Sequence, residues 1–307
     1  MKIVYLILFL LVIAGCTGSF TSQTGTVPAS EIQNTYRTGW QGVVLQTMRN
    51  LPPQEIFTDS NFMIGIEAHN RGAYDIDNGL IVLVYDEDYV QLHQKSIGFS
   101  LEGKNPFFQR GETKQFFVDG QTKSLGSESV QRSLPFYIFA CYPYEAILVE
   151  TICLDVSYET NQFSGQSTCT FRQGNSFSGQ GGPVGISATS YTVTEDRQTL
   201  SGRFIVDITL RHSGRGSVVD APSFYSACTQ GITQDMADRV KIREVALSDV
   251  TLNCNRDEVV LRNNQATIQC SVDGLPAHLF PYNAPLRIEL EYGYVETLNT
   301  NVLLKRG

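Results

Sequence analysis

The chain has 307 residues, of which 42% are hydrophobic, and it carries 23 Lys and Arg against 31 Asp and Glu, a formal net charge of −8. This acidic balance, without any run of three basic residues, argues against a nucleic-acid partner, because phosphate binding needs concentrated Lys and Arg. The length is sufficient for two domains of ordinary size, each with its own hydrophobic core.

The first residues have the layout of an export signal. Lys2 precedes an apolar run, residues 3–14, which is well short of the roughly 20 residues that a membrane-spanning helix needs. The run leads into Ile13-Ala14-Gly15-Cys16, which closely resembles the lipobox of bacterial and archaeal lipoproteins. That resemblance implies that the signal peptide 1–15 is removed and that the thiol of Cys16 is lipidated. An ordinary signal peptide, followed by a cysteine by chance, is the alternative.

Residues 16–35 are rich in Ser, Thr, Gly and Gln, so we expect a flexible tether between the lipidated Cys16 and the folded part. From Trp40 onward the sequence is typical of β-structure. Phe62, Ile64 and Ile66 alternate with other residues at period two. Further β-branched and aromatic runs, separated by Gly, Pro, Asn and Asp, predict strands at 80–85, 116–118, 136–141 and 146–153. We assign residues 36–172 to a first domain.

The polar, Gly/Ser-rich stretch that ends near Val184 predicts a linker, placed at residues 173–184, and a second domain follows at 185–307. There the pattern begins again: residues 204–214 align with residues 62–72 at an offset of 142, with Gly214 matching Gly72. Each copy is an alternating strand, a turn containing Gly, and a new apolar segment, which indicates duplication. Residues 285–304 predict a half-buried strand followed by a hairpin through 297–301. Residues 233–247 could hold a single helical turn at most.

Short strands broken by turns, without helices to cover a parallel sheet, predict an all-β fold of two tandem antiparallel sandwiches. A resemblance agrees with this. The alternating strand that ends in Asn70-Arg71-Gly72 resembles immunoglobulin-like domains of the cell-adhesion-related (CARDB) type. The Cys141-Tyr-Pro-Tyr144 motif and the Gly-Gln-Gly-x-Pro-Val segment at 179–184 are similar to exported lipoproteins of small-genome archaea. The family implies two immunoglobulin-like β-sandwiches on a cell surface and supplies no functional residues.

Six cysteines remain after Cys16, and an even number in an exported chain predicts disulfides. A zinc site is disfavoured because CxxC pairs are absent and the four His are dispersed. Six cysteines allow fifteen connectivities, which sequence alone does not resolve. The two close spacings favour Cys153–Cys169 and Cys254–Cys270, which leaves Cys141 and Cys228 to join the two halves.

No catalytic constellation is found: GxSxG, HExxH and GxxxxGK[ST] are all absent. His69 and His212 fall at or next to the equivalent turns of the two copies, which favours hydrogen bonding within the turns. Acidic residues flank the strand at 80–85, and we interpret them as solvated turns rather than a calcium site: Asp75, Asp77, Asp86, Glu87 and Asp88. Six tyrosines are candidates either for the core or for a contact surface: Tyr137, Tyr142, Tyr144, Tyr158, Tyr292 and Tyr294. We expect no metal and no cofactor.

These observations predict a non-enzymatic protein, extracytoplasmic and anchored to the outer face of a cell membrane through lipid on Cys16. It would act in binding or adhesion, or as an envelope component, with a protein or glycan partner at the cell surface. A substrate-binding or hydrolytic subunit of an envelope complex is the alternative, which a deep pocket with convergent carboxylates or His would favour. A purely structural coat component is a third possibility, which long exposed strand edges would indicate.

Overall fold

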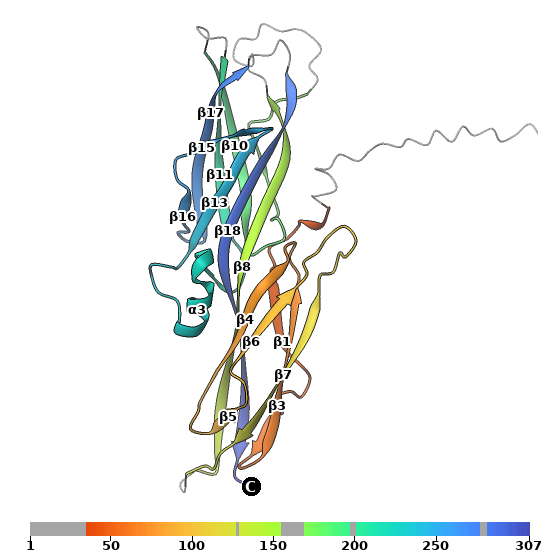
Figure 1. Ribbon diagram of the computed structural model, residues 1–307, viewed down its shortest axis with the longest axis vertical. Coiled ribbons are helices and arrows are strands. Elements are labelled where there is room, and N and C mark those ends of the chain that lie inside the picture. The colour runs from red at the N-terminus through yellow and green to blue at the C-terminus, as the bar shows by residue number, and fades with distance from the viewer. Residues whose placement is uncertain (1–34, 127–128, 155–168, 197–200, 277–280) are drawn as a thin grey trace, which may run out of the picture.

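The computed structural model describes residues 35–126, 129–154, 169–196, 201–276 and 281–307 (Figure 1). The predicted signal peptide, Cys16 and the tether up to residue 34 therefore lie outside the described residues. So do Tyr158 and His278.

Within the described residues the chain forms three sheets. The four-stranded sheet has the order β1 (Val43–Thr47), β3 (Asn61–Asn70), β7 (Thr113–Thr122) and β5 (Val90–Leu92). The five-stranded sheet has the order β15 (Asn253–Cys254), β17 (Gln265–Pro276), β11 (Ser201–His212), β10 (Val184–Asp196) and β9 (Gly174–Ser176). The nine-stranded sheet has the order β14 (Val250–Thr251), β13 (Arg239–Leu247), β18 (Tyr282–Lys305), β8 (Gln131–Leu154), β4 (Ile76–Tyr85) and β6 (Ser96–Leu101). Three short strands join the last sheet: β12 (Ser217–Val219) and β2 (Glu55–Phe57) on β18, and β16 (Glu258–Val260) on β13.

The nine-stranded sheet is shared by two sandwiches that lie end to end. Its two longest strands, β8 and β18, have 24 residues each and pair antiparallel along their whole length, from Gln131↔Lys305 to Leu154↔Tyr282. Figure 1 shows both strands running along the long axis of the molecule, with β3 and β7 beside one end and β10, β11 and β17 beside the other. Apolar side chains from facing sheets fill one continuous core. The predicted all-β fold of antiparallel sandwiches is confirmed, and β2 is the exception, since it pairs parallel to β18.

The internal repeat is visible in the strand pairing. The first copy pairs Val43 of β1 with Asn70, and the second pairs Val184 of β10 with His212, 142 residues after Asn70. The orders β1-β3-β7 and β10-β11-β17 correspond. Each copy ends in one of the two 24-residue strands. Because these strands are antiparallel, the copies are related by an approximate two-fold rotation, and the last strand of each copy extends into the sandwich of the other.

This exchange explains two differences from the sequence-based expectations. The predicted hairpin at 297–301 is wrong: β18 continues through it, because β8 supplies a hydrogen-bonding partner as far as Lys305. Strand pairing also joins the two predicted domains, since Thr297 of the second pairs with Phe139 of the first. That residues 36–172 and 185–307 are separate domains stays a prediction. The nine-stranded sheet contains strands from both segments.

The segment predicted as a linker, residues 173–184, is packed against the body of the protein. Part of it forms β9, and residues 179–184 are buried. Gln180 is 3% exposed; its side chain accepts a hydrogen bond from Ile186 N at 2.7 Å and donates one to Ile186 O at 3.0 Å. Small residues let this segment run close to the core, so its composition reflects tight packing as well as a turn.

One helix lies on the outer face of the nine-stranded sheet. The 3₁₀ turn η2 (Ala221–Ser223) leads into α3 (Phe224–Gln230). This helix precedes residues 233–247, the segment for which the sequence allows a single helical turn at most. Residues 239–247 form the strand β13, because their apolar side chains point from the nine-stranded sheet into the core. Ala227 and Cys228 of α3 pack with Cys141, Val219 and Val295.

The described residues form three disulfide bonds: the two pairs that the spacing favoured and the pair of cysteines that remained. Cys153–Cys169 and Cys254–Cys270 each close a separation of 16 residues. Cys141–Cys228 spans 87 residues and ties α3 to the middle of β8. This third bond therefore joins the second copy of the repeat to the last strand of the first.

Candidate functional site

Four tyrosines meet at the junction of the two sandwiches, where β8 and β18 cross from one to the other. Tyr142 and Tyr144 of β8 lie opposite Tyr294 and Tyr292 of β18, and all four are at most 2% exposed. Their ring centroids lie 5.7–6.0 Å apart in tilted or edge-on contacts. Such pairs stabilise a core beyond the area that they bury.

The hydroxyl groups of this tyrosine cluster bind the backbone of both copies in the same way. Tyr142 Oη accepts a hydrogen bond from Val43 N at 2.9 Å, and Tyr292 Oη accepts one from Val184 N at 3.1 Å. Tyr144 Oη accepts one from Tyr74 N at 3.4 Å and donates to Gly181 O at 2.9 Å. Tyr294 Oη accepts one from Gly216 N at 2.7 Å.

Glycines make these approaches possible. Gly72 lies against the hydroxyl of Tyr144, and Gly214, its counterpart 142 residues later, lies against the hydroxyl of Tyr294. A Cβ at either position would overlap the phenol oxygen. Burial also raises the pKa of Tyr142 and Tyr292 well above the ordinary value for a phenol, so these hydroxyls stay neutral. The cluster therefore holds the two copies together through neutral hydroxyl groups.

A groove of about 320 Å³ lies beside this cluster, on the edge formed by β1. Its floor is β18 from Tyr294 to Leu298, and its walls come from residues 40–45 and the turn at 213–215. Trp40, the only tryptophan of the chain, lies against the backbone of Gly179 and Gly185. Arg71 and Arg215 line the groove from the equivalent turns of the two copies. The volume falls in the range of small-ligand sites.

The single carboxyl group among the groove's described lining residues is that of Glu296. Burial raises its pKa from 4.5 to about 7, and the guanidinium of Arg215 opposes that rise. The phenols of Tyr142 and Tyr294 also lie within electrostatic range of Glu296. Among the ion pairs between described residues, none includes Glu296 or Arg215. A partly buried carboxyl with a perturbed pKa, together with two guanidinium groups and an indole, makes this groove the candidate site.

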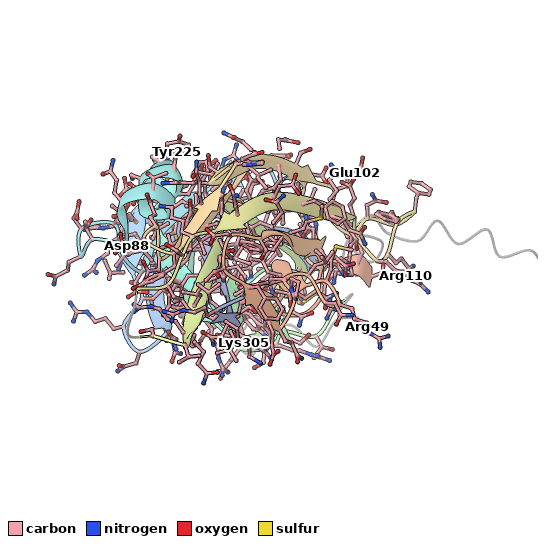
Figure 2. All side chains as sticks on the ribbon, turned by 90° about the horizontal axis from the view of Figure 1, so that it is seen from below. Arg49, Asp88, Glu102, Arg110, Tyr225 and Lys305 are labelled. Atoms are coloured by element: carbon pink, nitrogen blue, oxygen red, sulfur yellow. A yellow bond between two sulfur atoms is a disulfide. The ribbon has the colours of Figure 1, made fainter. Side chains whose placement is uncertain are left out.

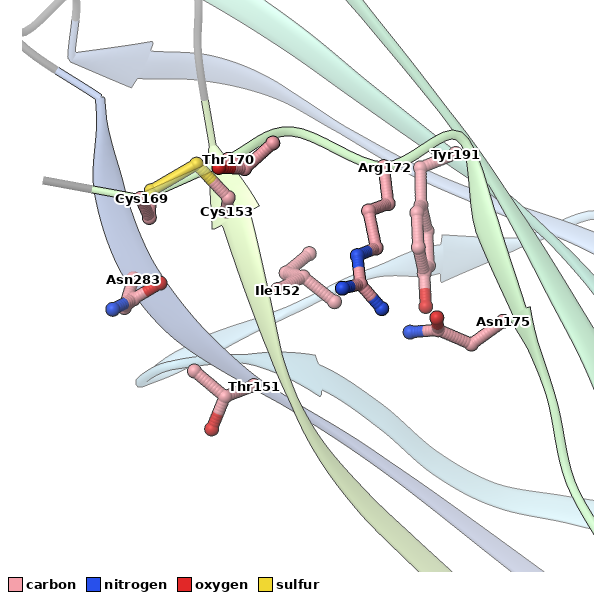
Figure 3. A pocket seen from close by; sticks show the side chains of 9 residues that line it. All are labelled: Thr151, Ile152, Cys153, Cys169, Thr170, Arg172, Asn175, Tyr191 and Asn283. Carbon is pink, nitrogen blue, oxygen red and sulfur yellow. A yellow bond between two sulfur atoms is a disulfide. The ribbon is translucent and has the colours of Figure 1, made fainter. Parts of the chain in front are cut away.

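A second cavity, of about 340 Å³, lies at the far end of the second sandwich (Figure 3). Figure 3 shows the guanidinium group of Arg172 beside Tyr191 and Asn175, with the Cys153–Cys169 bond at the rim. The lining residue Asn175 donates a hydrogen bond from Nδ2 to the buried side chain of Glu150 at 2.9 Å, and Glu150 also accepts one from Thr189 Oγ1 at 3.0 Å. Asn175, Thr189 and Glu150 are thus bonded to one another, and we favour the groove as the candidate site.

The structure separates most of the sequence-based candidates from the groove. His69 Nε2 lies 2.8 Å from Arg110 O, and His212 Nε2 lies 3.4 Å from Tyr294 Oη, so both histidines bond near the equivalent turns. Asp75 Oδ1 accepts a hydrogen bond from Gly103 N, and Asp86 pairs with Arg132 at 3.2 Å. Within the part of the chain that the structure describes, no group of three or more His, Cys, Asp or Glu is arranged to hold a metal ion. Nor does any helix there have the length and apolarity to span a membrane.

The structure shows which of the candidate tyrosines lie in the core and which lie on the surface. The four members of the tyrosine cluster belong to the core, whereas Tyr137 is 42% exposed on the surface of β8. The groove residues Trp40, Arg71, Arg215 and Glu296 were not singled out from the sequence. Only the uniqueness of Trp40 could have marked one of them, because the groove forms where the two copies meet.

Comparisons with known proteins leave the function open. No protein-family model matches the chain, and no curated protein matches it at a significant level. A crystal structure of the YadV chaperone aligns over 75% of this chain and 85% of its own, at 6% identity and a TM-score of 0.19. The partial N-terminal region of an enterococcal surface protein aligns over 84% of both chains, at 12% identity and a TM-score of 0.20. The secreted serine protease VesC from Vibrio cholerae, of which this chain spans about half the length (53%), also has a TM-score of 0.20. Likenesses at this level carry no functional inference.

Proposed function

We propose that this chain is a lipid-anchored, non-enzymatic protein of the outer face of a cell membrane, and that it binds acidic glycans in the groove between its two sandwiches. The convergence of Trp40, Arg71, Arg215 and Glu296 on that groove is the observation that carries the binding proposal. The three disulfides support an extracytoplasmic location, since such bonds persist in oxidising compartments.

The chemistry of the groove favours a sugar that carries a carboxylate. An indole offers a flat apolar face to the C–H face of a sugar ring, while guanidinium groups bind carboxylates in a planar, bidentate manner. Two arginines line the groove, although the chain as a whole carries a net charge of −8. Glu296 has a pKa of about 7, so near neutral pH its carboxyl group can donate a hydrogen bond to a sugar hydroxyl or accept one from it.

The alternative of a hydrolytic subunit receives less support from the same residues. Glycoside hydrolysis ordinarily needs two carboxyl groups on either side of the bond that is cleaved. The described lining of the groove supplies one, Glu296, and no histidine. Binding without turnover therefore fits the groove better than hydrolysis does.

The anchor is tested by Cys16→Ser in the full chain expressed in a host that makes lipoproteins. We expect loss of lipid labelling and loss of the processed, membrane-associated form, because the lipid is attached at this thiol. Unchanged lipid labelling and fractionation would contradict the anchor.

The groove is tested by calorimetric titration of the protein with oligogalacturonate and with a neutral galactose oligomer of equal length. We expect binding of the acidic oligomer only. Arg215→Gln should weaken it about tenfold or more, because a hydrogen bond to a charged group contributes about 1.5–3 kcal/mol.

Arg203→Gln is the matched control, since Arg203 is an exposed arginine of the same copy that pairs with Asp273 at 3.4 Å, away from the groove. Equal binding of both oligomers, or equal weakening by both variants, would count against the groove. Binding of an acidic peptide in place of the oligomer would redirect the proposal to a protein partner.

A further inference from the structure

The loop between β6 and β7, residues 102–112, presents an aromatic side chain to solvent. Phe107 is 99% exposed and the adjacent Phe108 is 40% exposed. Isolated exposed apolar residues are common on protein surfaces. A phenylalanine with almost no contact to its own protein, next to a second one at the tip of a loop, calls for a different explanation.

The loop is held in place by hydrogen bonds. Asn105 Oδ1 accepts bonds from Phe107 N at 2.9 Å and Phe108 N at 2.8 Å, which closes a turn at the tip. At the base, Gly103 N donates to Asp75 Oδ1 at 2.7 Å, and Glu112 N donates to Glu102 O at 2.9 Å. Phe107 is therefore displayed on an ordered turn, so inserting it into a partner requires little further ordering.

The tip also differs in charge from the rest of the protein. Residues 104–110 contain Lys104 and Arg110 and no acidic residue, whereas the whole chain has a net charge of −8. The acidic residues nearest in sequence, Glu102 and Glu112, lie at the base, where Glu112 pairs with Lys114 at 3.1 Å. An apolar tip flanked by cations matches the interface of an anionic bilayer, where aromatic rings lie at headgroup level beside basic side chains.

The loop lies next to the segment that leads to the predicted anchor. Lys104 Nζ donates a hydrogen bond to Thr38 O at 3.2 Å. Thr38 follows Cys16 by 22 residues and lies three residues after Thr35, where the described chain begins. The groove lies along β1, and the loop adjoins one end of it, since Lys104 N donates to Gly72 O at 2.7 Å, next to the groove residue Arg71. A bilayer at the loop would thus meet the side where the described chain begins.

We propose that the loop 102–112 is a membrane-docking element that inserts Phe107 into the bilayer, with anionic headgroups facing the exposed Arg110. This inference rests on the proposed lipid anchor, which keeps the loop at the membrane. Insertion of one loop would restrict how the anchored molecule tilts on its tether and would hold the groove in a defined orientation.

The test uses the full, lipidated protein reconstituted in vesicles of phosphatidylglycerol and phosphatidylcholine with brominated acyl chains, which quench tryptophan fluorescence at short range. Phe107→Trp, in a Trp40→Phe background, places the sole tryptophan at the loop tip. Tyr225→Trp in the same background is the matched control, because Tyr225 is 59% exposed on α3. Figure 2 shows Tyr225 and Arg110 on opposite sides of the molecule.

We expect the tryptophan at 107 to be blue-shifted and strongly quenched, and the tryptophan at 225 to be unaffected. Quenching should decrease with Arg110→Gln and in vesicles of phosphatidylcholine alone. Protein that floats with the vesicles but shows no quenching at 107 would overturn loop docking and leave the anchor intact, and the exposed loop would then be assigned to a protein partner. Protein that does not float would overturn both proposals.

Discussion

In the first copy of the repeat, β4 runs without interruption from Ile76 to Tyr85, whereas the equivalent path in the second copy is interrupted. There β12 ends at Val219 and β13 begins at Arg239, and the residues between them include η2 and α3. Both paths pair with the last strand of their own copy: β4 with β8, and β12 and β13 with β18. The insertion therefore leaves the sheet intact and adds a helix to its outer face.

The two copies agree where they meet. Each uses two tyrosines of its last strand to bind backbone N–H groups, and each places a glycine against one of those hydroxyls. They differ in the features that face solvent: Trp40 and the loop 102–112 occur in the first copy, and α3 occurs in the second. The shared features satisfy buried polar groups and so serve stability, whereas the unshared ones are free to serve binding.

Removing the bond between the copies should have the largest effect. The variant Cys141→Ala with Cys228→Ala opens a crosslink over 87 residues, and the chain-entropy model predicts a loss of about 4–5 kcal/mol in the free energy of unfolding. Opening Cys254–Cys270, with its separation of 16, should cost about 3 kcal/mol. Denaturant unfolding measures both values. A smaller loss for the long-range pair would mean that α3 does not hold the copies together.

Alanine at the two equivalent glycines should cost less, and similar amounts in each copy. Gly72→Ala and Gly214→Ala place a methyl group against Tyr144 Oη and Tyr294 Oη, respectively. Overpacking of this kind costs about 1–3 kcal/mol. Gly126→Ala is the matched control, because a Cβ there would meet no atom within 4 Å. Thermal unfolding of the three variants checks the expectation, and a loss confined to one copy would contradict the equivalence of the two junctions.

The smallest effect should come from Glu296, which has no counterpart in the first copy's half of the groove. Its pKa is raised from 4.5 to about 7 on folding, so the folded state binds an extra proton between these values. Its contribution is therefore most favourable below about pH 4.5 and is lost as the pH rises through about 7. We expect Glu296→Gln to reduce the loss of thermal stability between acidic and neutral pH. An identical pH profile for the variant and the parent protein would contradict this assignment.

Much of the architecture was accessible to sequence reasoning because it depends on local pattern. The alternation through Phe62, Ile64 and Ile66, and its recurrence 142 residues later, indicated buried strands and a repeat, since residues two apart share one face of a strand. The even number of cysteines after Cys16, together with the export signal, indicated disulfides. Spacing favoured Cys153–Cys169 and Cys254–Cys270, and Cys141–Cys228 was the pair that remained. The predicted lipidation of Cys16 lies outside the described residues and stays a prediction.

Only the tertiary structure decided how the copies are joined. Whether a stretch such as 282–305 forms one strand or a hairpin depends on whether a partner strand is available along its whole length, and β8 provides one. The same pairing brings Glu296 into one groove with Trp40, which lies 256 positions earlier in the chain. Local pattern determines which residues are buried on a strand. The choice of partner strand is a long-range matter of register and backbone hydrogen bonding, and the candidate site is a product of that choice.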